Sequence, residues 1–271
     1  MTVRPAAGGG RWVEVAPARL RRWLDGFARR HGAFAAAAVG GDAVEIVRLT
    51  AADGAVAECH VPFPPLEPER DADAPGRAEA GPEDAAPGGR GARPAASVPG
   101  AAVSLTHPAA GAGVPELVER LIAHANRPRR VGVLLVRLGG HAAGVFDGDR
   151  LVASKVGARH VQGRSAAGGW SQQRFARRRE KQASEALRAA ADVAARVLVP
   201  RLPDLHAVVL GGDRRAVDAL RADPRLAGVF ALAAPPFLAV PDPRLAVLES
   251  TPALFRAVRI RVLDPDRPGP R

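Results

Sequence analysis

The sequence has one cysteine, Cys59, no tyrosine, and only two lysines, Lys155 and Lys181. A single cysteine excludes an intramolecular disulfide and any metal site that needs two or more thiolates. The seven histidines form neither an H-x-x-x-H nor an H-E-x-x-H pair, so the usual zinc-hydrolase arrangements are missing. These absences argue against thiol chemistry and metal catalysis.

The chain also lacks a long apolar run. Its start, MTVRPAAGGGRWVEV, does not contain the apolar segment of a signal peptide, and no uninterrupted apolar stretch is long enough to span a bilayer. We therefore expect a soluble, cytoplasmic protein with no membrane partner.

Several common catalytic and nucleotide-binding motifs are missing as well. The sequence has no P-loop and no G-x-G-x-x-G, and neither Ser165 nor Ser171 lies in a G-x-S-x-G elbow. The segment VVLGGD at 208–213 is expected to be a strand-to-helix turn capped by Asp213. The apolar run VGVLLVRL offers no carboxylate for a metal-dependent nuclease, and Asp147 and Asp149 resemble turn formers. We expect no metal and no small-molecule cofactor.

The charge that is present is basic and unevenly placed. Lysine and arginine total 39 against 28 acidic residues, a net charge of +11. Between residues 155 and 188 only Glu180 and Glu185 are acidic, while nine side chains are basic. A basic surplus concentrated in one region favours a polyanionic partner, of which nucleic acid is the commonest. The nine are Lys155, Arg159, Arg164, Arg174, Arg177, Arg178, Arg179, Lys181 and Arg188.

Three regions follow one another along the chain. Residues 12–63 combine a helix pattern with two strands joined at Asp53-Gly54, which predicts a small N-terminal α+β unit. Residues 64–113 are rich in Pro, Ala, Gly, Glu and Asp without periodicity, so we expect a disordered linker. Residues 114–264 alternate helices with buried strands, which indicates an α/β domain with a mixed sheet and flanking helices.

The periodicity predicts a long helix from about Ser171 to Leu198, ended by Pro200. Its basic residues fall on one stripe at 100° per residue, with Arg179 as the exception, and its apolar residues fall on the opposite side. The helix is therefore expected to pack by one face and to present a basic ridge with the other.

The stretch GRSAAGGWSQQRFARRREKQ, Gly163–Gln182, precedes and begins this helix. A Gly-Gly segment, then glutamine, then RFARRR resembles the catalytic loop of eukaryotic-type class 1 release factors. It is more similar to the actinobacterial branch of the VLRF-type peptidyl-tRNA hydrolases, and VLGGDR matches as well. The resemblance extends from about Val114 to the C-terminus and implies a release-factor catalytic-domain topology, which is ribonuclease H-like.

The resemblance implies a peptidyl-tRNA hydrolase that releases nascent chains on stalled ribosomes in ribosome quality control, with peptidyl-tRNA and rRNA as partners. Trp170 occupies the position of the family's usual glutamine, so Gln172 is the preferred catalytic residue and Gln173 stays open. Gly168 and Gly169 then allow close approach of the loop to RNA. The expected RNA contacts are Arg164, Trp170, Arg174, Arg177, Arg178 and Lys181. For Trp170 two uses stay open, stacking on an unpaired base or packing the loop onto its own domain.

An amide does not titrate near neutral pH, so such a glutamine acts by orienting water or by donating to oxyanion charge. The ester that joins peptide to tRNA is labile enough for positioning to be effective. Two alternatives stay open: the glutamines are solvated residues at a helix start, or the chain is a non-catalytic RNA- or ribosome-binding module that uses the same basic helix.

Overall fold

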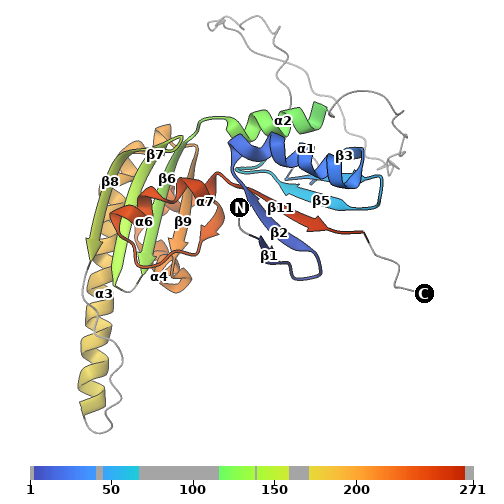
Figure 1. Ribbon diagram of the computed structural model, residues 1–271. Coiled ribbons are helices and arrows are strands. Elements are labelled where there is room, and N and C mark those ends of the chain that lie inside the picture. Colours follow the sequence, from blue (N-terminus) through green and yellow to red (C-terminus); the bar gives the residue numbers. More distant parts are fainter. Residues whose placement is uncertain (1–2, 41–44, 67–115, 138, 159–170, 266–271) are drawn as a thin grey trace, which may run out of the picture. The chain divides into compact units, whose positions relative to one another are not determined.

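The computed structural model describes residues 3–40, 45–66, 116–137, 139–158 and 171–265, and of residues 171–179 it describes the backbone only (Figure 1). The described residues of both of its sheets belong to one compact unit. None of the helices in these ranges is long and apolar enough to cross a membrane.

The first sheet has six antiparallel strands in the order β1-β2-β11-β5-β4-β3. Two helices, α1 and α2, share its core. The elements are β1 (Val3–Pro5), β2 (Arg11–Val15), α1 (Leu20–His31), β3 (Phe34–Val39), β4 (Ile46–Ala51), β5 (Val56–His60), α2 (Glu116–Asn126) and β11 (Val258–Leu263).

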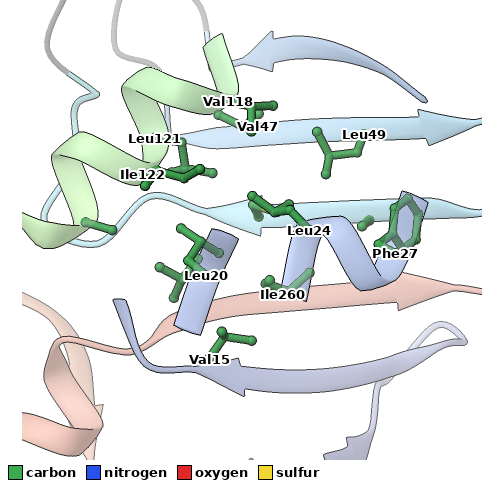
Figure 2. Packing of buried hydrophobic residues seen from close by; sticks show 14 of the residues in the cluster. Val15, Leu20, Leu24, Phe27, Val47, Leu49, Val118, Leu121, Ile122 and Ile260 are labelled. Atoms are coloured by element: carbon green, nitrogen blue, oxygen red, sulfur yellow. The ribbon is translucent and has the colours of Figure 1, made fainter. Parts of the chain in front are cut away.

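Alternation along the strands forms the core of this sheet. In β4 every second residue is buried, and the same holds for β5 and β11, so one face is apolar. Leu20, Leu24 and Phe27 of α1 are buried in the same core as Val118 and Leu121 of α2, and Figure 2 labels all five. Cys59 lies in the same core, and burial raises the pKa of its thiol to about 12, so it stays protonated at neutral pH.

The second sheet has five strands in the order β10-β9-β6-β7-β8. Strands β6, β7 and β8 form an antiparallel meander, and β9 and β10 run parallel to β6. This order and direction match the ribonuclease H-like topology, which confirms the predicted fold class. The strands are β6 (Arg130–Arg137), β7 (Gly140–Asp147), β8 (Arg150–Ala158), β9 (Ala207–Gly212) and β10 (Ala233–Leu238).

Helices cover both faces of the second sheet. On one face, Leu134, Val136 and Val145 pack with α3, α4 and α5; on the other, Val133 and Leu135 pack with α6 and α7. Figure 1 shows α6 and α7 in front of the strands and α3 and α4 behind them. The helices are α3 (Ser171–Val197), α4 (Arg214–Ala219), α5 (Ala227–Ala231), α6 (Leu245–Glu249) and α7 (Pro252–Phe255), with short 3-10 turns at Pro17–Arg19, Val199–Asp204, Leu220–Ala222 and Pro224–Leu226.

The structure differs from the expected segment boundaries in two places. Helix α2 and strand β11 come from the range 114–264, yet both pack with the N-terminal unit, and β11 lies between β2 and β5. Periodicity identifies a strand but does not say which sheet it joins, because pairing depends on residues far away in the sequence. The expected linker lies outside the described residues from position 67, while Leu66 is buried in the first core.

Candidate nucleic-acid interface

Helix α3 positions the predicted site. It packs across β7 and β8, and its fully buried residues Ala190, Ala191, Ala194 and Val197 all lie in its C-terminal third. Among the α3 side chains that are described, none before Ala190 is fully buried. The helix is about 40 Å long at 1.5 Å per residue, and its N-terminal part extends past the ends of the strands (Figure 1). The sheet therefore anchors one end of α3 and leaves the other projecting.

The basic and apolar faces of α3 separate as predicted wherever side chains are described. Lys181 and Arg188 are exposed and lie seven residues apart, which puts them on the same side of the helix. Ala190, Ala194 and Val197 are buried on the opposite side. Glu180 is also exposed, so this part of the surface is not purely cationic.

The predicted catalytic residues fall at the start of the helix. Because α3 begins at Ser171, Gln172 and Gln173 are in its first turn, where backbone N–H groups have no partner within the helix. Their side chains are outside the described residues, as are those of Arg174, Arg177 and Arg178. Gly168, Gly169, Trp170 and Arg164 lie in the segment 159–170, outside the described part of the chain. These assignments stay predictions.

Strand β7, which pairs with the strand that precedes this segment, carries a polar residue that the sequence alone did not single out. His141 of β7 pairs in register with Gly157 of β8, one residue before β8 ends. It is 95% buried, and a Cβ atom at Gly157 would lie 2.3 Å from its Nε2. Alternation along β7 places His141 on the same face as Ala143, which packs with α3. The sequence does not show that His141 lies over Gly157, because Gly157 looks like any other glycine in a strand. The pairing of β7 with β8 is needed to see it.

Asp147 and Asp149 have the structural role expected of them. They flank Gly148 in the β7–β8 turn, where Gly148 adopts a positive φ of 65°. A carboxylate oxygen of Asp147 lies 3.8 Å from a guanidinium nitrogen of Arg130. A carboxylate oxygen of Asp149 lies 3.8 Å from a guanidinium nitrogen of Arg256, so both carboxylates face cations. No cluster of three or more His, Cys, Asp or Glu side chains suited to a metal ion occurs in the described ranges.

The VLGGD segment is a strand-to-helix turn, as predicted. Asp213 is the N-cap of α4, and its carboxylate accepts hydrogen bonds from the backbone N–H groups of Arg215 and Ala216. Gly212 has a φ of 101°, and a Cβ atom there would lie 2.2 Å from the Val136 carbonyl oxygen. The fold itself therefore requires this glycine.

Comparison with known proteins gives a family match and weak structural matches, among them two archaeal structures. Residues 129–261 match the family model described as Actinobacteria/chloroflexi VLRF1 release factor, acVLRF1. A crystal structure of an archaeal translation termination factor, aRF1, is 18% identical with a TM-score of 0.36, and covers 53% of this chain and 40% of that one. A second structure, described only as an archaeal protein, is 17% identical with a TM-score of 0.35, over 53% of this chain and 39% of that one.

The similarity thus spans less than half the length of each solved structure. No curated protein matches the chain. The family match begins just before β6 and ends within β11, so it includes the five-stranded sheet, the predicted loop and all of α3. Over residues 129–261, just under half of the chain, the sequence therefore matches the Actinobacteria/chloroflexi VLRF1 release factor family.

Proposed function

We propose that this protein is a peptidyl-tRNA hydrolase that releases nascent chains from tRNA on stalled ribosomes. The match of residues 129–261 to a release factor family supports a translation-related function at the ribosome, and it is the observation that carries the proposal. The position of Gln172 and Gln173 in the first turn of a projecting helix supports it further.

In this proposal a glutamine amide orients water at the ester carbonyl and donates a hydrogen bond to the developing oxyanion. The amide does not exchange a proton near neutral pH, so water or the leaving tRNA hydroxyl must carry the proton. The N–H groups of the first helical turn add a positive end of the helix dipole close to the same place. Exposed cations such as Lys181 and Arg188 would contact RNA phosphates and fix the register of the helix without reading sequence.

A release assay on stalled ribosome–nascent chain complexes tests the proposal. We expect Gln172→Ala combined with Gln173→Ala to slow release by roughly 10²–10³-fold, the usual effect of losing an oxyanion donor, while ribosome binding is retained. Gln182→Ala is the matched control, because it removes a third glutamine of the same helix, ten residues further on. Release by the double variant at the wild-type rate would show that the catalytic assignment is wrong.

A second candidate is a non-catalytic RNA- or ribosome-binding module. The exposure of Lys181 and Arg188 on one side of α3 favours it equally, because that surface needs no chemistry to bind phosphates. This candidate predicts that Arg177→Glu with Arg178→Glu abolishes association and that the wild-type protein never cleaves the ester. The same release assay therefore separates the two functions.

A further inference from the structure

A second basic surface lies on the first sheet, far along the chain from the predicted loop. A groove of about 510 Å³ runs beside α1, lined mainly by one face of that helix and by β2. We call it the α1 groove and define it by Arg19, Arg22, Trp23, Gly26, Arg29 and Arg30. These positions recur at three- and four-residue spacing, so they form one stripe about 16 Å long at 1.5 Å per residue.

The four groove arginines are exposed, and their guanidinium groups make no ion pair or hydrogen bond within the described ranges. Arg21, on the same helix but outside the groove, shows the contrast, because both of its terminal nitrogens contact the Glu119 carboxylate of α2. Among the groove's lining residues only Glu14 is acidic. Arg19 and Arg22 lie three residues apart and Arg29 and Arg30 are neighbours, so these like charges repel one another and an anionic ligand would stabilise the arrangement.

Trp23 and Gly26 lie between the arginines on the same stripe. The Trp23 indole is half-buried and lies nearly parallel to the Phe27 ring, at 13° and 5.7 Å between centroids. A partly exposed aromatic ring inside a cationic groove is the arrangement that proteins use to stack an unpaired base.

Gly26 is unusual because nothing in the fold requires it. It lies in the interior of α1, where glycine is less stable than alanine. A Cβ atom there would meet only the flexible ends of Arg29 and Arg30, at 3.7 and 4.0 Å. The missing side chain leaves the floor of the groove open between Trp23 and the C-terminal arginines.

We propose that the α1 groove binds a single-stranded RNA segment, with guanidinium groups on phosphates and a base stacked on Trp23. The stripe spans several nucleotides of a stacked strand at roughly 3.4 Å each. An acidic peptide would leave the aromatic ring without a role, and a bilayer surface would not enter a groove. The proposal deepens the proposed function, on which it rests for the expectation of an RNA partner, by giving the N-terminal unit a share in RNA binding.

Fluorescence anisotropy with the full chain and a labelled 12-nucleotide single-stranded RNA tests this. Each binding curve is measured in the background Lys181→Glu with Arg188→Glu, which weakens the α3 surface. Adding Arg22→Glu and Arg29→Glu is expected to weaken binding at least tenfold and to lower the salt slope of log K by about two. The matched control adds Arg215→Glu in α4 and Arg244→Glu at the N-cap of α6, two exposed positions, for the same change in net charge.

Gly26→Ala is a second test, because a glycine with only a structural role would not affect RNA affinity. It is expected to raise the melting temperature and yet to weaken RNA binding several-fold, because the added methyl group fills the floor of the groove. Equal affinity of the groove and control variants would overturn the proposal. So would displacement of the RNA by polyglutamate or by phosphatidylserine vesicles at lower concentrations than by unlabelled RNA.

Ultraviolet crosslinking of a 4-thiouridine RNA locates the contact directly. Tryptic digestion is expected to yield a crosslinked peptide Trp23–Arg29, and its absence from the crosslinked set would contradict the placement. The release assay is independent of these measurements. If the groove variants lose RNA binding and the wild type shows no release activity, the groove proposal holds and the hydrolase proposal is wrong. If the wild type releases peptide and the groove variants bind RNA as well as the control, the hydrolase proposal holds and the groove proposal is wrong.

Discussion

Helices α1 and α3 both place an apolar face on a sheet and turn arginines outward, but they are held in different ways. α1 buries three large side chains, Leu20, Leu24 and Phe27, spread over most of its 12 residues. α3 is 27 residues long, and of its described side chains, from Glu180 onward, those fully buried are three alanines and one valine in its last third. Large side chains along the whole length fix α1 firmly. Small ones at one end let α3 lie close to its sheet while its start reaches outward.

This difference separates two uses of a basic helix. A helix fixed along its length presents a preformed groove, which favours binding at low entropic cost. A helix anchored at one end carries the residues at its other end away from the core, where a large RNA has access. Substitutions in each helix test whether α1 is held along its length and α3 at one end.

Phe27→Ala is expected to have the largest effect on stability. Phe27 is fully buried and packs near Trp23, His31 and Phe34, so truncation removes apolar contacts and leaves a cavity. The free energy of unfolding should fall by about 3–5 kcal/mol, measured by urea denaturation. A loss no larger than that of an exposed substitution would mean that α1 is not firmly held.

Enlarging alanines along one face of α3 sharpens the comparison. Ala194 is fully buried, so Ala194→Leu should overpack the contact with the sheet and cost about 1–3 kcal/mol. Ala183 lies on the same face three turns earlier and is only half-buried. Ala183→Leu is expected to change the free energy of unfolding by less than about 0.5 kcal/mol. Equal losses in both variants would show that the sheet supports α3 further toward its start.

Local features of the fold could be predicted from the sequence because neighbouring residues determine them. The long helix, the turns at Asp53-Gly54 and Asp147–Asp149, and the cap at Asp213 all appear as expected. The position of β11 could not be predicted in this way, because its partners in β2 lie more than 240 residues earlier in the chain. Its alternating pattern would suit either sheet.

The two candidate sites differ in the same way, since one depends on neighbouring residues and the other on residues far apart in the chain. The loop and α3 could be identified from a contiguous motif, which a resemblance can match residue by residue. The α1 groove could not, since each arginine of RLRRWLDGFARR resembles an ordinary exposed helix residue. Only the fold shows that Arg21 is paired to α2 while Arg22 and Arg29 line a hollow beside β2.

Gly26→Ala measures how much stability α1 loses by having a glycine in its interior, at the floor of the α1 groove. Alanine is a better helix former, and the new methyl group has space, so the free energy of unfolding should rise by about 0.5–1 kcal/mol. Thermal and urea unfolding measure the gain. Ala186→Gly, at a half-buried position in the middle of α3, is the converse control and should lose a similar amount. A destabilised Gly26→Ala protein would mean that the glycine serves packing.

The smallest expected effect concerns the contact that pins the end of α1. The Nδ1 atom of His31, the last residue of α1, lies 2.8 Å from an Asp53 carboxylate oxygen. The pKa of Asp53 lies below its ordinary value, first because the Ala55 amide donates to it and then because of His31. A depressed folded-state pKa means that the ionised group stabilises the fold above its unfolded pKa, and that this contribution is lost as the pH falls through the folded value.

Asp53→Asn keeps an acceptor for the Ala55 amide but removes the charge that faces His31. We therefore expect a slightly lower melting temperature than wild type at pH 7, with the difference disappearing as the pH falls below about 4. The effect is small because Asp53 is exposed to solvent. Asp25→Asn, at an exposed carboxylate of α1 without a hydrogen bond in the described part of the chain, is the control. If the Asp53→Asn difference persisted unchanged into acid, the geometry of the turn would hold the end of α1, and the carboxylate charge would not contribute.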